Sequence, residues 1–220
     1  MANPSQYEPS LTAPKPFTGP KQRIDEAGCN IRNQEGRMMR LQPIEQPSGL
    51  MMRIAWWMTR RRFGKVITPM KVVQARVPKS LRASYEITKV MEHGFSLDKD
   101  LQFLLHTHIS MVNQCGFCID IARAATLQEN GSLERIDKLA QFRVDPAFSP
   151  AERAALAYVE EVSRTKTASD ATFNELRSHF NDQQIAEITM LNAFENCYNL
   201  INRPLGIESD GLCALVRRTG

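Results

Sequence analysis

The sequence predicts an all-α protein. Apolar residues recur at intervals of three and four, capping residues precede the segments in which they do so, and no alternating run is long enough for a strand. The 220 residues, 42% hydrophobic and 24% charged, are enough for one globular domain with a tail. We therefore expect one helical domain with an additional terminal segment.

Residues 1–48 differ from the rest and predict an extended, proline-rich N-terminal arm. Five prolines stand in the first twenty positions, and few apolar residues follow before Met38. Because proline lacks an amide donor and fixes φ, we expect this arm to be extended or disordered, or laid on a neighbouring subunit. Residues 49–220 are expected to form the helical domain.

The first predicted helix covers LMMRIAWWMTRRRFG, from Leu50 to Gly64. The stretch is apolar at first and then basic, and cations stabilise the C-terminal end of a helix. This pattern favours an amphipathic helix or a subunit contact. Trp56 and Trp57 beside arginines leave contact with a membrane surface as the alternative.

Further helices are expected to begin at serines. Ser80 is expected to cap a helix that runs through residue 93, with Gly94 as its left-handed stop. Ser96 is expected to open the helix that leads to the cysteines, and a short helix is expected over residues 132–142.

The C-terminal third carries the strongest helix-start signals. Ser149-Pro150-Ala151-Glu152 is a capping box with proline at the first helical position. A helix over residues 169–180 is expected next, and Asn181 with Gln184 opens a last long helix that ends at Pro204 and Gly206. The buried face of this last helix is predicted to consist of Ile185, Ile188, Leu191, Phe194, Tyr198 and Ile201.

Composition disfavours several classes of protein. The net charge is only +4 and the basic residues are dispersed apart from TRRRFGK, so nucleic acid is not an expected partner. The start MANPSQYEPS lacks the basic and apolar parts of a secretory signal. The longest apolar run, IAWWM, is far below the roughly 20 residues of a membrane span. We expect a cytoplasmic protein whose five cysteines form no disulfide framework.

The chemistry concentrates in LLHTHISMVNQCGFCIDIARAA, residues 104–125. Cys115 and Cys118 there could form a redox dithiol, bind a metal, or be small buried residues. His106 and His108 precede them, but residues two apart on a helix point about 200° from one another. The two histidines therefore cannot both bind a zinc ion together with the cysteines. We expect no metal and no cofactor.

A helix break favours the redox dithiol. Asn113, Gln114 and Gly116 around Cys115 indicate that one helix ends and another begins there. Free amides and the dipole at a helix N-terminus stabilise a thiolate and lower its pKa. A CxxC at such a position can close a disulfide with little backbone movement.

The stretch VNQCGFCIDIARAA resembles the CxxC core of the alkylhydroperoxidase D-like branch of the carboxymuconolactone decarboxylase family. SPAERAALAYVEEVS, DATFNELRSHFNDQQIAEIT and NRPLGIESDG are similar to the C-terminal half of such proteins, so the resemblance covers about residues 50–211. It implies an alkylhydroperoxidase D-like helical bundle that assembles into trimers or hexamers. In redox-active members it implies a dithiol peroxidase or disulfide reductase, with Cys118 attacking and Cys115 resolving.

The sequence departs from the family at two positions of its proton relay. Redox members carry a glutamate twelve positions before the first cysteine and a histidine four after the second, where this chain has Phe103 and Ala122. Asp120 is not at a relay position. His108 is the candidate replacement, because an imidazole on the stripe leading to Cys115 can titrate near neutral pH and take a thiol proton. The alternative is a histidine that is buried and bonded to backbone, or exposed at the helix end.

The remaining polar and sulfur-bearing residues receive structural interpretations. His106 is expected to be solvated, and so is Glu195. Cys29, Cys197 and Cys213 are interpreted as structural or incidental, with Cys197 buried as a small hydrophobe.

Three functions follow from these observations. The first is a thiol-dependent peroxidase or disulfide reductase, whose partners are a small peroxide or disulfide substrate and a thiol reductant or reductase. The second is a cysteine-independent enzyme of the decarboxylase type acting on a lactone or β-keto acid, which the missing relay favours. The third is a non-catalytic oligomeric protein whose arm and Trp56/Trp57 helix mediate assembly or membrane contact.

Overall fold

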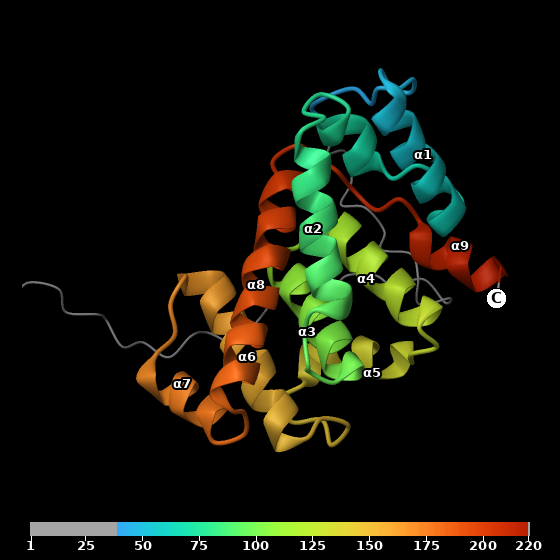
Figure 1. Ribbon diagram of the computed structural model, residues 1–220. Coiled ribbons are helices and arrows are strands. Elements are labelled where there is room, and N and C mark those ends of the chain that lie inside the picture. Colours follow the sequence, from blue (N-terminus) through green and yellow to red (C-terminus); the bar gives the residue numbers. More distant parts are fainter. Residues whose placement is uncertain (1–38, 220) are drawn as a thin grey trace, which may run out of the picture.

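The protein is described by a computed structural model over residues 39–219, and within this range its regular structure is helical throughout (Figure 1). The all-α prediction is confirmed. Residues 1–38, with most of the predicted arm and Cys29, lie outside the described residues. The elements in chain order are α1 (Leu50–Phe63), a π-helical turn (Met70–Gln74), α2 (Ser80–His93), α3 (Lys99–Val112), α4 (Gly116–Gln128), α5 (Leu133–Asp137), a 3₁₀ turn (Leu139–Gln141), α6 (Pro150–Thr165), α7 (Asp170–Arg177), α8 (Asp182–Asn202) and α9 (Leu212–Thr219).

Helix α3 is the centre of the domain. It packs against α4, α6 and α8, and Figure 1 shows it enclosed among them. Its apolar residues Leu104, Leu105 and Ile109 are buried, and so are polar residues on its other sides. A helix buried on nearly all sides must satisfy its polar groups with partners from other helices. The site described below arises from that requirement.

The strongest predicted helix starts are confirmed. Ser149 and Glu152 form the expected capping box of α6, with Pro150 at the first position. Asn181 and Gln184 form a second box at the start of α8. Each box needs only residues three apart, so the local sequence specifies it.

Three predicted features of helix ends are wrong. Ser80 is the first residue of α2 rather than its cap, and its hydroxyl donates to Val77 O at 2.7 Å. Gly94 ends α2 with φ −93°, which is not left-handed. Ser96 does not open α3, because its amide donates to Glu187 Oε2 at 2.9 Å and Asp98 caps the helix instead.

Other boundaries shift by a few residues. The helix expected over residues 132–142 is divided into α5, which Ser132 caps as expected, and the 3₁₀ turn. Helix α7 is capped by Ser169 but ends at Arg177, short of residue 180. The π-helical turn and α9 were not predicted. Asp120 caps α9, since its carboxylate accepts from the amides of Leu212 and Cys213 at 2.9 Å each.

Helix α1 lies at one end of the molecule and α7 at the other, and α2 runs lengthwise across the face in view (Figure 1). In α1 Trp56 is buried and Trp57 is 62% exposed. Gly64 ends the helix as expected, and it takes the left-handed conformation. Helix α2 contains no buried residue.

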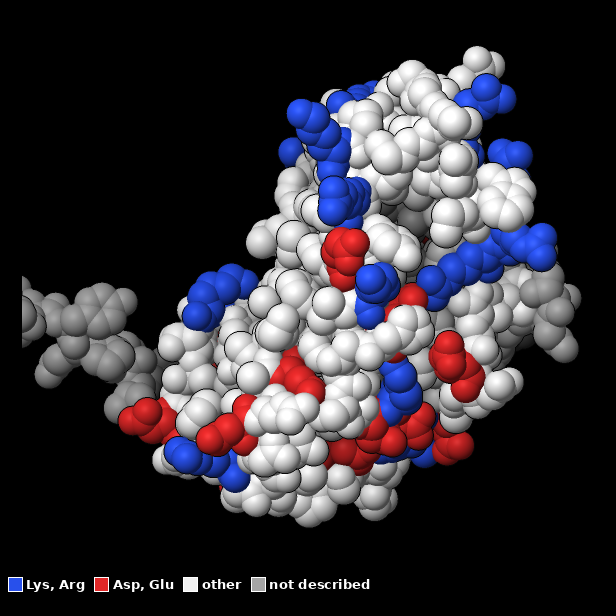
Figure 2. All heavy atoms as spheres, in the orientation of Figure 1, with Lys and Arg blue, Asp and Glu red and all other residues white. Residues whose placement is uncertain are grey.

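On the face shown in Figure 2, acidic side chains gather at the end opposite α1. Among the described residues, no helix has both the length and the apolar character needed to cross a membrane.

Candidate functional site: a dithiol at a helix junction

The predicted helix break is confirmed. Helix α3 ends at Val112, Gln114 takes a positive φ of 55°, and α4 begins at Gly116 with Cys115 as its N-cap. The Cys115 amide donates to Ser110 O at 2.9 Å, which fixes the turn. The motif therefore stands at the N-terminus of a 13-residue helix, where unpaired amides favour negative charge.

Cys115 and Cys118 form a disulfide, with their Cα atoms 5.2 Å apart. Both side chains are buried. The carboxamide of Asn202, the last residue of α8, donates from Nδ2 to Cys118 Sγ at 3.4 Å, while its own Oδ1 is buried without a partner. A donor aimed at sulfur stabilises a thiolate more than a thiol, so Cys118 has a polar partner that sequence reasoning did not identify.

Gly116 allows a carboxylate to approach the motif. A Cβ at this position would lie 2.9 Å from Glu208 Oε2. Glu208 belongs to the segment that follows α8, and this segment passes over the start of α4. The carboxylate of Glu208 therefore lies beside Gly116, the first of the two residues between the cysteines.

A second polar cluster lies between α3 and α8. Glu195 is 1% exposed, and its Oε2 lies 2.6 Å from His106 Nε2. Its Oε1 accepts hydrogen bonds from the Ser110 hydroxyl and Asn199 Nδ2, at 2.6 Å each. Burial lowers the pKa of His106, but the charge of Glu195 and the hydrogen bond to it raise that pKa by more. The net effect is a pKa of His106 above its ordinary value, so the contact with Glu195 favours the charged imidazolium.

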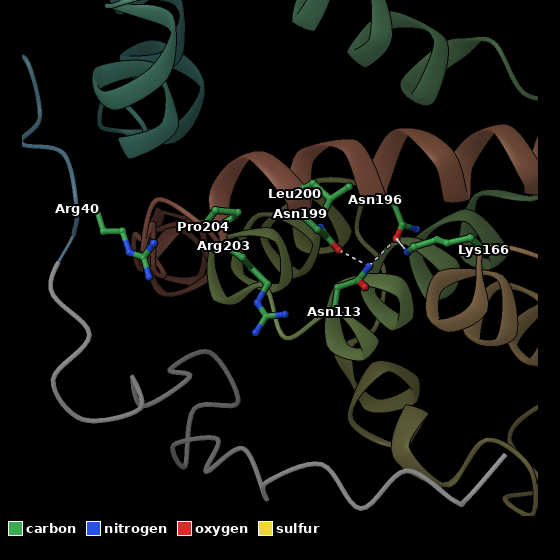
Figure 3. A pocket seen from close by; sticks show the side chains of 8 residues that line it. All are labelled: Arg40, Asn113, Lys166, Asn196, Asn199, Leu200, Arg203 and Pro204. Carbon is green, nitrogen blue, oxygen red and sulfur yellow. Dashed lines mark hydrogen bonds between the residues drawn. The ribbon is translucent and has the colours of Figure 1, made fainter.

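Asparagines extend this cluster along α8 as far as the dithiol. Asn192, Asn196, Asn199 and Asn202 recur at intervals of three or four, and we call them the α8 carboxamide face. Asn113, at the end of α3, donates from Nδ2 to the Oδ1 atoms of Asn199 at 2.8 Å and Asn196 at 3.1 Å (Figure 3). Within this face Asn199 donates to Glu195, and Asn202, one helical turn further on, donates to Cys118.

His108 points toward α6, away from this cluster. Its Nε2 lies 3.6 Å from Glu160 Oε2, and its ring meets Phe142 edge-on with 5.0 Å between centroids. The pKa of His108 is lowered, and burial of the imidazole is the main cause. The prediction that His106 and His108 point in nearly opposite directions is confirmed. Among the described residues no contact joins His108 to either cysteine, and its part in proton transfer stays a prediction.

Three interpretations of single residues are wrong. His106 is paired rather than solvated, and Glu195 is buried. Cys197 is an exposed free thiol. A sequence signal for the cluster does exist: Glu195, Asn199 and Asn202 lie on one side of a helix whose predicted stripe is apolar, and such a polar row requires partners.

A shallow cavity of about 270 Å³ adjoins the carboxamide face (Figure 3). It is lined by Arg40, Asn113, Lys166, Asn196, Asn199, Leu200, Arg203 and Pro204. Within residues 39–219 no group of three or more His, Cys, Asp or Glu side chains is arranged to hold a metal ion.

Comparison with known proteins agrees with this architecture. Residues 86–161 match the Carboxymuconolactone decarboxylase family. The uncharacterized protein YnjA of Escherichia coli K12 is 31% identical over 168 residues, which cover 76% of this chain and 92% of YnjA.

Two solved structures share the fold. An uncharacterized peroxidase-related protein from Silicibacter sp. TM1040 superposes with a TM-score of 0.71 at 21% identity, over 84% of this chain and all of that one. ATU0492 from Agrobacterium tumefaciens, of unknown function and suggested to be an AhpD antioxidant defence protein, superposes with a TM-score of 0.57 at 25% identity, over 63% of this chain and 96% of that one.

Proposed function

The chain belongs to the carboxymuconolactone decarboxylase family, and from this premise we propose that it is a thiol-dependent peroxidase or disulfide reductase of the alkylhydroperoxidase D-like type. One observation carries the proposal: Cys115 and Cys118 form a disulfide at the start of α4, with a hydrogen-bond donor on Cys118. The family and the CxxC pair are consistent with this chemistry.

The proposed reaction is a two-electron transfer. The Cys118 thiolate attacks an oxygen of a hydroperoxide, the O–O bond breaks, and the protein holds a sulfenic acid while the alcohol leaves with a proton. The Cys115 thiol then attacks that sulfur, water leaves, and the disulfide forms. A thiol reductant or reductase returns two electrons and two protons to the dithiol. We place this cycle in a reducing compartment such as the cytoplasm.

Two features support Cys118 as the attacking sulfur. Asn202 Nδ2 lies 3.4 Å from its Sγ and would stabilise the thiolate. Cys115 is the N-cap of α4, so its sulfur is positioned to close onto Cys118 through one turn of helix.

Proton transfer to and from the dithiol requires an ionisable group, and three candidates are present. His108 is the predicted one, and burial is the main cause that lowers its pKa. Glu208 lies against Gly116 inside the motif. The third is the His106–Glu195 pair, whose Glu195 lies about two helical turns before Asn202 on α8.

The deciding experiment is mass spectrometry of the reduced protein after one equivalent of hydrogen peroxide. We expect a Cys115–Cys118 disulfide in the wild type and a trapped sulfenic acid in Cys115→Ser. Peroxide consumption should be lost in Cys118→Ser and kept in Cys197→Ser, a matched control because Cys197 is an exposed free thiol. Equal consumption by Cys118→Ser would reject the proposal.

The absence of the family's relay residues favours one alternative, a cysteine-independent decarboxylase-type enzyme. Phe103 and Ala122 occupy the relay positions, and neither can transfer a proton. This alternative requires turnover of a lactone or β-keto acid by a variant in which both cysteines are serine. The same variant would be inactive if the dithiol carries the reaction.

We also propose that the chain assembles into a homo-oligomer, a trimer or hexamer, through α1. Apolar side chains that are each at least half exposed line this helix: Leu50, Met51, Ile54, Trp57 and Met58. Such a continuous apolar surface marks an interface more often than a solvent-facing helix. Light scattering during gel filtration should report a smaller particle for Trp57→Glu and no change for Val144→Glu, a 79% exposed position outside α1.

A further inference from the structure

Three cations of separate origin surround the cavity beside the dithiol (Figure 3). Arg40 precedes α1 and is tethered by its amide, which donates to Leu205 O at 3.0 Å. Lys166 follows the last residue of α6, and Arg203 follows the last residue of α8. No acidic residue lines the cavity, and within the described part of the chain neither arginine forms an ion pair. Both guanidinium groups are therefore available to an incoming anion.

The floor of the cavity is fixed and uncharged. Asn113 donates from Nδ2 to Asn196 and Asn199, and Asn196 Nδ2 donates to Ser163 Oγ at 3.1 Å. Because these carboxamides are held by one another, they define the shape of the floor. The cations supply the charge that would select a ligand.

The cavity lies close to the reactive sulfurs along two helices. Asn113 precedes Cys115 by two residues. Asn199 precedes Asn202 by three residues, about 4.5 Å along the helix axis, and Asn202 donates to Cys118 Sγ. One lining residue, Asn199, is therefore about one helical turn from the residue that contacts Cys118, and another, Arg203, directly follows that residue.

We propose that this cavity binds the oxyanion head group, a carboxylate or phosphate monoester, of the substrate that Cys118 reduces. The inference rests on the proposed dithiol chemistry and deepens it, since it names the class of substrate. Guanidinium groups bind planar or tetrahedral oxyanions through paired hydrogen bonds. A volume of about 270 Å³ accommodates a head group and leaves the rest of a larger molecule outside.

The test compares two substrates that differ only in this head group. Reduced protein is mixed with linoleic acid hydroperoxide or with its methyl ester, and the second-order rate constant of dithiol oxidation is measured for each. We expect the acid to react about tenfold faster than the ester in the wild type. Arg40→Gln and Arg203→Gln should each lower this ratio about threefold, and both together should abolish it.

Arg177→Gln on α7 is the matched control, because it removes the same charge from a residue that does not line the cavity. It should leave the ratio unchanged. Equal rates for acid and ester in the wild type would refute the inference while leaving the peroxidase proposal in place. A preference for the acid that persists in the double variant would refute it as well.

A binding measurement keeps the inference testable without turnover. Octanoate, octyl phosphate and octanol are titrated into the oxidised protein by calorimetry, with the double arginine variant beside the wild type. Binding of either anion, absent for octanol and for the double variant, supports the site even if no peroxide is consumed, and the stronger anion identifies the head group. If neither anion binds better than octanol, the inference is wrong.

Discussion

Glu195→Gln is the substitution that best tests the buried cluster between α3 and α8. The glutamate is 1% exposed, its Oε2 is 2.6 Å from His106 Nε2, and its Oε1 accepts two hydrogen bonds. Glutamine preserves the volume and one acceptor oxygen while removing the charge. The change therefore isolates the electrostatic part of the cluster from its packing.

The expected loss follows from the contacts. Removing one partner of a buried ion pair costs about 3–5 kcal/mol. His106 is 22% exposed, so part of its charge remains solvated, and the glutamine oxygen can still accept from Ser110 or Asn199. We expect a decrease of about 2–3 kcal/mol in the free energy of unfolding, which for a chain of this size is roughly 4–12 °C in Tm.

The loss should depend on pH, and the raised pKa of His106 gives its direction. A group whose folded pKa lies above its unfolded value contributes stability below the unfolded pKa, near 6.5, and loses that contribution as the pH rises through the folded pKa. Denaturant unfolding of the oxidised protein at pH 6 and pH 9 measures it. The difference between wild type and Glu195→Gln should be largest at pH 6.

Glu175→Gln is a matched control. Glu175 pairs with His179 on the surface at 3.4 Å, and its side chain is 65% exposed. Exposed pairs contribute about 0.2–1 kcal/mol, so this variant should remain close to wild type. A difference of less than about 1 kcal/mol for Glu195→Gln at pH 6, or the same difference at both pH values, would refute the assigned ion pair.

Three more variants test neighbouring contacts. Burial raises the pKa of Glu160, but hydrogen bonds and the charge of surrounding cations lower it by more, to about 2. The free energy of unfolding of the wild type should therefore exceed that of Glu160→Gln by about 2 kcal/mol at pH 7, and this difference should vanish between pH 4.5 and 2. A difference that does not depend on pH would contradict this. Asn202→Ala should slow alkylation of Cys118 in the reduced protein at pH 7, because the thiolate loses a hydrogen-bond donor, and an unchanged rate would separate Asn202 from the thiolate. Gly116→Ala should lower stability by about 1 kcal/mol in urea unfolding, because its Cβ meets Glu208 Oε2, and adding Glu208→Ala should remove most of that loss; additive effects would count against this contact.

How far the fold could be predicted depends on whether the interactions of an element are local. The capping boxes at Ser149 and Asn181 involve residues three apart, and both were predicted. Ser96 was assigned to a cap, yet its partner is Glu187, a residue on α8 that local sequence cannot indicate. Helix α9 was not predicted because it is short and its cap, Asp120, lies 92 residues before Leu212.

The site divides in the same way. The CxxC motif and the helix break around it are written in consecutive residues, so their placement at the start of α4 was predicted. His106 and Glu195 belong to separate helices, and each looks like a solvated polar residue when taken alone. Only the packing of α8 against α3 brings them to 2.6 Å.

The nature of the residues between Glu195 and Cys118 bears on which group moves the proton. Asn199 and Asn202 donate and accept hydrogen bonds, but a carboxamide does not titrate. These residues can therefore hold a neighbouring group in position, but they cannot pass a proton from that group to the dithiol. Among the three candidates for proton transfer, only Glu208 touches the motif itself. We therefore expect Glu208→Gln to slow oxidation of the dithiol by about 100-fold, as loss of a general base does.

His106→Gln and His108→Gln serve as the comparisons for that measurement. Neither histidine contacts a cysteine within residues 39–219, so the oxidation rate of each variant should differ from wild type by less than about tenfold. A wild-type rate in Glu208→Gln, together with a rate about 100-fold slower in His108→Gln, would return the role to the histidine that the sequence predicted. Gly116 has no side chain, and this leaves one side of the motif open to the carboxylate of Glu208, from which we expect the proton to leave.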